Sequence, residues 1–248
     1  MKIGIVFGAS GLLGPIWVKA LAQKSDIVYC IGLGIKKDPE LKEINEKNPG
    51  KYVLIEQDLL KPIQEINNVK FDFGIFSAAT DSVPALSSVN ELGKFSIGSW
   101  EPFINNQKIF INCLDFFCSN RSAESYGVVI GSMYTTSLPE NKNYVNENGE
   151  LKFIKHPGYS SSKVAIKNIM QQYAVDFAKN SLVLNMLSPG VVTNNHPDWF
   201  IKNIIRHIPN QKFIDKIELI DSVDFLTSKG ARHLVGQELL LDGGYNLW

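Results

Sequence analysis

The sequence predicts an α/β protein in which helices cover both faces of a doubly wound, mostly parallel sheet of seven strands. First, short and nearly continuous apolar runs alternate with amphipathic segments from one end of the chain to the other. Second, a glycine-rich turn follows the first apolar run directly. Third, the 248 residues contain no repeat, low-complexity tract or linker, so we expect a single domain over 1–248.

The predicted strands are recognised by apolar runs too short for helices. Strands of a parallel sheet are buried on both faces, so they lose the alternation of apolar and polar residues that a half-exposed strand shows. In chain order the runs lie at 2–8, 26–34, 51–58, 71–79, 126–133, 181–188 and 237–244.

Helices are expected between these runs. The segment 12–25 carries Leu13, Trp17, Ala20 and Leu21 at the spacing of one helix face. The other predicted helices lie at 39–48, 99–118 and 157–179, followed by an irregular helical region near 195–227. One long polar stretch, 138–158, reads as a loop inside the domain.

Charge and cysteine content narrow the class of protein. Lysine plus arginine and aspartate plus glutamate both number 25, so no basic surplus favours nucleic acid or an anionic membrane as a partner. Three cysteines without framework spacing predict reduced thiols and a cytoplasmic location. The four histidines lack the spacing of metal ligands, so no metal is expected. No apolar run reaches the ~18 residues that a membrane span needs.

The turn "GASGLLG" is a candidate dinucleotide-binding loop. Gly8, Gly11 and Gly14 would let the backbone approach a pyrophosphate, whose charge the following helix N-terminus would stabilise. Ser10 and Leu13 lie in the same turn and are predicted to contact the cofactor. The alternative is a tight turn that needs small residues only for packing.

The end of the second predicted strand bears on the choice of dinucleotide. An acid there would bind the ribose 2′-hydroxyl of NAD, but residues 32–34 are Gly-Leu-Gly. Lys36 and Lys37 follow and would tolerate the 2′-phosphate of NADP, unless they are only a solvated loop. Asp38 could serve if the loop were shifted. The sequence predicts NAD or NADP and leans slightly to NADP.

Tyr159 and Lys163 stand one helical turn apart in "HPGYSSSKVAIKN". Residues at i and i+4 share a helix face, so the pair could be accidental or could be a device for proton transfer. Only the other motifs can decide between these two readings.

Taken together, the motifs resemble the short-chain dehydrogenase/reductase family across essentially the whole chain, which implies a Rossmann-type fold. "DL" resembles the acid motif that meets the adenine ring, and "FSAAT" stands where the family has NNAG, lacking its asparagine and glycine. "LSPGVVT" resembles the segment that holds the nicotinamide. The resemblance therefore implies these further cofactor-binding residues: Asp58, Leu59, Ala78, Ala79, Tyr159, Lys163, Pro189, Gly190, Val192 and Thr193.

The same resemblance implies a catalytic set of Asn112, Ser132, Tyr159 and Lys163. Tyr159 would exchange a proton with the substrate oxygen, Lys163 would lower the pKa of the phenol from its usual ~10, and Ser132 would orient the substrate. Asn112 would hold a water that links the lysine to solvent. Ser132 and Tyr159 are further apart than in the common pattern, so we expect an insertion at 134–156 to project over the active-site mouth.

The substrate is harder to predict. The segment 193–227 corresponds to the family's substrate lid, and the chain resembles oxidoreductases from bacterial surface-sugar gene clusters. The lid offers hydrogen-bonding groups and an aromatic platform that suit a polyol or sugar, namely Asn194, Asn195, His196, Trp199 and Arg206. Trp199 and Phe200 could instead form the core of the lid, and Tyr134 could either touch substrate or pack in the loop.

Two other functions stay open. A 3-oxoacyl-thioester reductase would need a basic docking face for an acidic carrier protein, which Lys202, Arg206 and Lys212 could supply. A dinucleotide-binding scaffold without catalysis is the third hypothesis. We also expect a homo-tetramer or homo-dimer with the aromatic tail, 245–248, at an interface, because exposed apolar edges are usually covered. The alternative is a tail that folds back over its own sheet.

Overall fold

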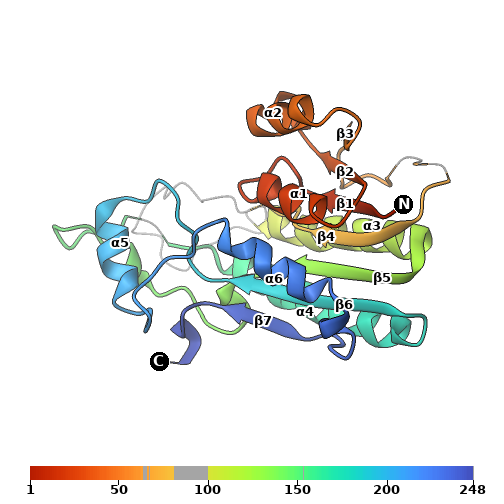
Figure 1. Ribbon diagram of the computed structural model, residues 1–248. Coiled ribbons are helices and arrows are strands. Elements are labelled where there is room, and N and C mark those ends of the chain that lie inside the picture. The colour runs from red at the N-terminus through yellow and green to blue at the C-terminus, as the bar shows by residue number, and fades with distance from the viewer. Residues whose placement is uncertain (64–65, 67, 81–99, 153, 248) are drawn as a thin grey trace.

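A computed structural model describes residues 1–63, 66, 68–80, 100–152 and 154–247. Its centre is a seven-stranded sheet in the order β3-β2-β1-β4-β5-β6-β7, with every neighbouring pair parallel (Figure 1). The predicted fold is confirmed. The strands are β1 (Ile3–Phe7), β2 (Ile27–Gly32), β3 (Tyr52–Glu56), β4 (Phe71–Phe76), β5 (Arg121–Ile130), β6 (Leu182–Pro189) and β7 (Glu238–Leu241).

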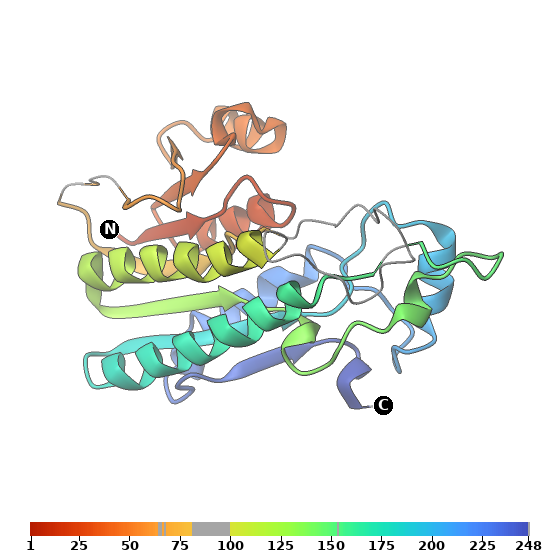
Figure 2. The same ribbon diagram turned by 180° about the vertical axis from the view of Figure 1, so that it is seen from behind.

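Helices cover both faces of the sheet. Helices α1 and α6 lie on one face (Figure 1), whereas α3 and α4 run side by side along the other (Figure 2). The helices are α1 (Gly14–Ala22), α2 (Pro39–Lys47), α3 (Glu101–Asn120), α4 (Pro157–Ala178), α5 (Asp198–Ile205) and α6 (Glu218–Leu226). Short 3-10 turns include η1 (Ile35–Lys37), η4 (Met133–Thr135), η5 (Asn141–Tyr144), η6 (Lys229–Ala231) and η7 (Tyr245–Leu247).

Each face has its own apolar core. Trp17 of α1 is fully buried between the sheet and α6, and its indole nitrogen donates to Ser77 Oγ at 2.9 Å. On the other face Phe117 of α3 and Met170 of α4 pack against β4, β5 and β6. Burying a large apolar side chain contributes about 1.5–3 kcal/mol. The two cores thus fix the sheet whose carboxyl edge carries the site.

The chain order of the strands reverses between β1 and β4. Strand β1 pairs with β2 on one side and with β4 on the other. In open parallel sheets ligands bind in the crevice at the carboxyl ends of the strands, at this switch point. The glycine turn after β1 and the segments after β4, β5 and β6 therefore meet at one edge.

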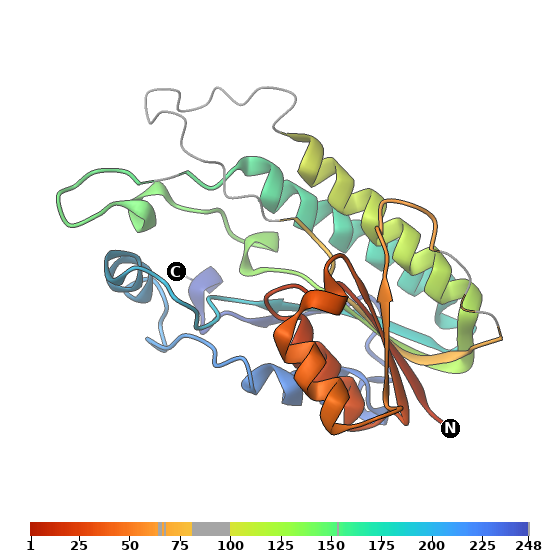
Figure 3. The ribbon, with the colours of Figure 1, turned by 90° about the horizontal axis from the view of Figure 1, so that it is seen from above.

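The segment predicted as a lid is shorter than 193–227. Residues 218–226 form α6, whose Leu219 and Val223 are buried against α1 in the core. The part that stands away from the sheet is α5 with its flanking loops, and it projects from the same end of the molecule as the insertion (Figure 3). Asn203 of α5 donates to the carbonyl of Val145 at 2.6 Å, so the two segments are joined directly.

The described part of the tail returns to its own chain. Tyr245 is only 6% exposed, lies 6.5 Å from the ring of Tyr134, and accepts a hydrogen bond from Asn143 Nδ2 at 3.3 Å. Tyr245 thus packs on its own chain, against the insertion and not over the sheet. Leu247 is 81% exposed and Trp248 lies outside the described residues, so the predicted oligomer stays a prediction.

Candidate active site

A cavity of about 600 Å³ opens at the carboxyl edge of the sheet. Its walls come from the glycine turn, the ends of β4, β5 and β6, the start of α4, the insertion and α5. Nine of the predicted site residues line it: Gly11, Leu13, Ala79, Ser132, Tyr159, Lys163, Pro189, Gly190 and Val192. Residues far apart in the sequence therefore meet in one space.

Helix α4 presents the tyrosine and the lysine. Its N-terminus is set by His156, whose Nδ1 accepts from the Gly158 amide at 2.9 Å, and by Pro157 in the first turn. Lys163 is 5% exposed, and its ammonium donates to the carbonyl of Ile130 at 3.0 Å. The same nitrogen lies 5.9 Å from the centre of the Tyr159 ring. An ammonium buried this deeply is costly without such partners, so its position is fixed.

Ser132 lines the cavity from the end of β5. It follows β5 directly, has extended backbone geometry, and its Oγ accepts from the Tyr134 amide at 3.2 Å. That hydrogen bond leaves the hydroxyl proton able to turn towards a ligand in the cavity. A hydroxyl, a phenol and an ammonium thus share one pocket.

A second lysine, which the sequence analysis missed, flanks the tyrosine. Lys155 Nζ lies 4.2 Å from the centre of the Tyr159 ring and also lines the cavity. Cations over aromatic faces are attracted by the ring quadrupole. Lys155 ends the irregular insertion, where no periodicity indicates which way a side chain points. The signal in the sequence is its position four residues before Tyr159, just as Lys163 stands four residues after it.

The outer part of the cavity has an aromatic wall. The hydroxyls of Tyr134 and Tyr144 lie 3.2 Å apart, and Tyr144 stacks on Phe200 with ring centres 5.7 Å apart. Burial raises the pKa of Tyr134, so this phenol stays protonated. Trp199 and Phe200 both line the cavity, and Phe200 also packs on His196. Phe200 is therefore both lid core and cavity wall.

The residues around the cavity fit a dinucleotide. Gly8 has φ +87°, and a side chain there would meet the backbone of Ala78 at 2.6 Å; at Gly14 it would meet the carbonyl oxygen of Ala9 at 2.0 Å. The turn itself therefore requires glycine at positions 8 and 14, as expected for a tight turn that needs small residues for packing. Gly11 is exposed and lines the cavity, so among these three glycines it is the one accessible from the cavity. The start of α1 lies directly behind it.

Sequence comparisons show that the chain is similar to known oxidoreductases. A family model described as "Enoyl-(Acyl carrier protein) reductase" matches residues 146–246. A 7alpha-hydroxysteroid dehydrogenase of Paraclostridium sordellii is 25% identical, with 99% of this chain and 92% of that protein aligned. A glucose 1-dehydrogenase of Gluconobacter oxydans is 32% identical, but over 37% of this chain and only 36% of that protein.

Solved structures share the fold over the whole chain. A short-chain dehydrogenase/reductase from Serratia marcescens superposes with a TM-score of 0.79 at 15% identity, covering 99% of this chain and 98% of that one. A gluconate 5-dehydrogenase from Burkholderia cenocepacia, in complex with NADP and tartrate, gives 0.77 at 15% identity, with 100% and 96% covered. The protein is an enzyme of the short-chain dehydrogenase/reductase type.

Asn112, which the sequence predicts as a catalytic residue, does not line the cavity. Its side-chain amide donates to the carbonyl of Leu59 at 3.0 Å, so it braces the segment after β3. On the same helix Asn106 is fully buried, with 0% of its surface exposed. Its Oδ1 accepts from the Thr80 amide at 2.6 Å, and its Nδ2 donates to the Thr80 carbonyl at 2.9 Å. Nδ2 also lies 3.4 Å from Ser162 Oγ, beside Lys163.

The sequence carried a signal for Asn106. The buried face of α3 runs through Phe103, Phe110, Leu114 and Phe117, and Asn106 is the polar residue on that stripe. A polar side chain on a buried stripe must be satisfied by specific partners, which marks it as structurally or functionally engaged. Asn112 lies off the stripe.

Other predicted cofactor residues of this dehydrogenase/reductase lie outside the cavity lining. Asp58 accepts from the Leu60 amide at 3.0 Å, and the side chain of Leu59 is buried in the core. Ala78 packs against Gly8. The amide of Thr193 donates to the carbonyl of Ile214 at 2.8 Å, and its side chain is exposed. Ser10 Oγ donates to the carbonyl of Leu33 at 2.7 Å and so joins the glycine turn to the end of β2.

An acid stands near the end of β2 after all, but it comes from β3. Glu56 pairs in register with Gly32, and its Oε1 accepts from the Gly34 amide at 2.5 Å. Asp38 is engaged as the N-cap of α2, where it accepts from the Leu41 amide at 2.9 Å. Glu56 therefore brings a carboxylate beside the strand end that lacks one.

Within the described part of the chain, every helix is too short or too polar to cross a membrane.

Proposed function

We propose that the enzyme transfers hydride between a nicotinamide dinucleotide and a hydroxyl or ketone of a sugar or sugar-derived substrate. The observation that carries the proposal is the convergence of Ser132, Tyr159 and Lys163 on the cavity that the glycine turn also lines. Three groups of this chemistry, on the loop after β5 and on α4, suit proton exchange with a substrate oxygen better than passive binding.

Each side chain has a role in this proposal. The nicotinamide supplies the hydride chemistry, and the protein supplies placement and electrostatics. Tyr159 exchanges the proton of the substrate oxygen, and Ser132 holds that oxygen by a hydrogen bond. Lys163, held on the Ile130 carbonyl, keeps a positive charge near the phenol and favours its ionised form.

The cavity wall supports a sugar-like substrate. Trp199 and Phe200 give an apolar platform on which the face of a sugar ring can stack, while Asn194 and His196 offer groups for hydroxyls. Two similar proteins carry the names glucose 1-dehydrogenase and gluconate 5-dehydrogenase. The resemblance to oxidoreductases of bacterial surface-sugar gene clusters points to the same class.

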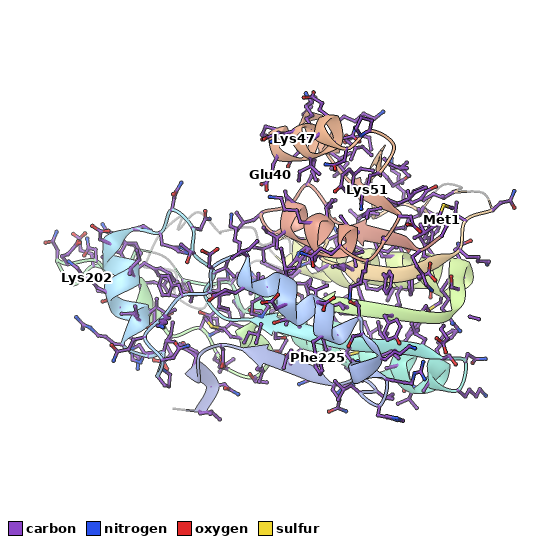
Figure 4. All side chains as sticks on the ribbon, in the orientation of Figure 1. Met1, Glu40, Lys47, Lys51, Lys202 and Phe225 are labelled. Carbon is purple, nitrogen blue, oxygen red and sulfur yellow. The ribbon has the colours of Figure 1, made fainter. Side chains whose placement is uncertain are left out.

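A 3-oxoacyl-thioester reductase is the second candidate. Lys202, Arg206 and Lys212 are exposed on and after α5, close to the cavity wall, where an acidic carrier protein could dock. Figure 4 shows Lys202 on the outer side of α5, at the end of the molecule far from Met1. A 3-oxoacyl-(acyl-carrier-protein) reductase of Buchnera aphidicola is 26% identical, with 98% of this chain and 96% of that protein aligned.

The dinucleotide is NAD or NADP. Lys36 and Lys37 are exposed in η1 and favour the 2′-phosphate of NADP, as the sequence suggests. Glu56 opposes it, because its carboxylate occupies the Gly34 amide that a phosphate oxygen would use. We propose that Glu56 outweighs the lysines and that NAD is preferred.

The test is a turnover screen of the purified protein with NAD(H) and NADP(H). One panel holds sugars, sugar acids, polyols and their ketones; the other holds acetoacetyl thioesters. Turnover on the first panel alone supports the proposal. Turnover on thioesters alone would replace it with the second candidate. Binding of a dinucleotide without any reaction would favour a non-catalytic scaffold.

We also propose a homo-oligomer, either a dimer or a tetramer. Val164 and Val175 on α4 are exposed apolar side chains, as is Leu247 in the tail. Apolar surface of this kind is commonly covered by a second copy. Light scattering at micromolar concentration should give a mass of two or four chains. A mass of one chain would contradict the proposal.

A further inference from the structure

A buried carboxylate lies beside the site without a part in the chemistry described above. Glu238 begins β7, and its side chain is 6% exposed. Lys167 Nζ lies 2.6 Å from its Oε2, and Ser188 Oγ donates to its Oε1 at 2.5 Å. The hydroxyl of Thr135 also donates to Oε1. A buried carboxylate costs several kcal/mol unless it is paired and hydrogen-bonded, and here both oxygens are engaged.

The three partners of Glu238 belong to the three segments that carry the site. Thr135 ends the turn that starts at Ser132, and its amide and hydroxyl lie 2.9 and 2.8 Å from the Ser132 carbonyl oxygen. Lys167 is one helical turn beyond Lys163 on α4. Ser188 lies within "LSPGVVT", the segment proposed to hold the nicotinamide, and immediately precedes Pro189 of the cavity wall.

These contacts make one side chain a polar link between three segments that also pack directly on one another. The turn after Ser132 packs on α4 and on β6, and the carboxylate lies where the polar groups of all three converge. The distance between a substrate oxygen on Ser132 and the phenol of Tyr159 depends on how that turn sits against α4. A misplacement of about 1 Å in such an arrangement can cost about 10²-fold in rate.

We infer that Glu238 is a positioning residue for the reaction: it holds the Ser132 turn, α4 and the end of β6 in the spacing that proton exchange needs. The inference rests on the proposed function, since it assigns Ser132 and Tyr159 their roles. It adds a residue from the last strand, where "ELLLDGG" opens an otherwise apolar run with an acid.

The test compares Glu238→Ala and Glu238→Gln with the wild type. Glutamine keeps an acceptor for the hydroxyls of Thr135 and Ser188 but loses the ion pair with Lys167. Glu124→Gln is the matched control, because Glu124 is an exposed acid of β5, two strands away in the sheet, and is paired with Arg232 at 3.3 Å. For each protein, kcat, KM, the melting temperature and the dissociation constant of the dinucleotide by direct titration are measured.

We expect Glu238→Ala to lower kcat by about 10- to 100-fold while the dissociation constant of the dinucleotide changes less than about threefold. Glu238→Gln should recover most of kcat, and Glu124→Gln should match the wild type. A folded Glu238→Ala with a kcat within about twofold of the wild type would overturn the inference, even if its melting temperature fell, since that pattern describes a purely structural residue.

Two milder variants keep the inference testable if Glu238→Ala does not fold. Thr135→Val and Ser188→Ala each remove one hydroxyl from the carboxylate, and each should lower kcat without weakening dinucleotide binding. Wild-type kcat in both would overturn the inference. A wild-type enzyme without turnover on either panel would instead contradict the proposed function, and this inference would fall with it.

Discussion

The two sides of the cavity differ in how far apart in the sequence their contacting residues lie. The proposed cofactor side comprises the glycine turn, 8–14, and the end of β4, with β2 and β3 beside them outside the cavity lining. The proposed substrate side comprises the insertion, 134–156, and the α5 region, 193–214, with Tyr245 of the tail packed against the insertion. On the cofactor side, strand, turn and helix follow one another within a few residues. On the substrate side, Asn203 contacts Val145 over 58 residues of chain, and Asn143 contacts Tyr245 over 102.

Local sequence patterns suffice to predict the glycine-turn side but not the side held by remote contacts. A strand followed by a glycine turn and a helix is fixed by backbone geometry, so spacing alone predicts it. A unit held by contacts between remote loops has no such signature. The predictions below test whether this division of the molecule also separates cofactor binding from substrate binding.

Lys163 lies where the two sides meet, and its loss should have the largest effect. Lys163→Met removes the charge near Tyr159, so turnover should fall by about 10²–10⁴-fold, and dinucleotide affinity should fall as well. Steady-state kinetics and direct titration of the cofactor check both. Lys179→Met, at the exposed end of the same helix, is the control and should behave as wild type. Undiminished turnover in Lys163→Met would mean that the cavity is not the active site.

Asn106 and Asn112 of α3 should differ next in their effects on turnover. Asn106→Ala leaves the amide and carbonyl of Thr80 without a partner, which should cost about 1–3 kcal/mol of unfolding free energy and reduce turnover. Asn112→Ala breaks one half-buried hydrogen bond to Leu59, so we expect about 1 kcal/mol and little change in turnover. Denaturant unfolding and kinetics measure the pair. The reverse ranking in turnover would restore the role that the sequence assigns to Asn112.

Replacing Glu56 tests which residues determine the choice between NAD and NADP. Glu56→Gln removes a carboxylate beside the end of β2, and at surface dielectric this should favour the 2′-phosphate by about 1 kcal/mol or more, or roughly fivefold. The ratio of NADP(H) to NAD(H) dissociation constants should rise in favour of NADP(H) by that factor. Glu46→Gln, on the exposed face of α2, serves as the control. An unchanged ratio would leave the choice to Lys36 and Lys37.

The aromatic wall tests the substrate side alone. Phe200→Ala removes the stack with Tyr144 and the contact with His196, and one aromatic pair is worth about 0.5–1.5 kcal/mol. We expect KM for the substrate to rise by about two- to tenfold, with the dissociation constant of the dinucleotide unchanged. Phe225→Ala, a half-exposed ring of α6 on another surface (Figure 4), is the control. Weakened dinucleotide binding in Phe200→Ala would mean that the two sides are not separable.

The thiols should show the smallest effect. Cys30, Cys113 and Cys118 all lie on β2 and α3, and burial raises their pKa values, to about 12 for Cys30 and about 11 for Cys118. At pH 8 the thiolate fraction is therefore very low, and a thiol reagent should leave the native protein unmodified while labelling all three after unfolding. Rapid labelling of the native protein would show that this part of the fold opens.

The sequence predicted the fold and part of the site for reasons visible in particular residues. Tyr159, Lys163 and Ser132 were predicted by motif similarity, and the structure brings all three to the lining of one cavity. Asn112 was predicted by motif similarity alone, and Asn106, the polar residue on the buried stripe of α3, was missed. Lys155, Glu56 and the burial of Tyr245 were missed because their positions depend on neighbouring strands or remote loops.

The most direct test of the central claim is the single substitution Tyr159→Phe, which removes one oxygen and leaves the ring. It is measured by dinucleotide titration and by turnover on the best substrate of the screen. The account predicts a dissociation constant within about threefold of the wild type and a kcat lower by about 10²–10⁴-fold. A Tyr159→Phe enzyme that binds the dinucleotide and turns over at the wild-type rate would contradict it.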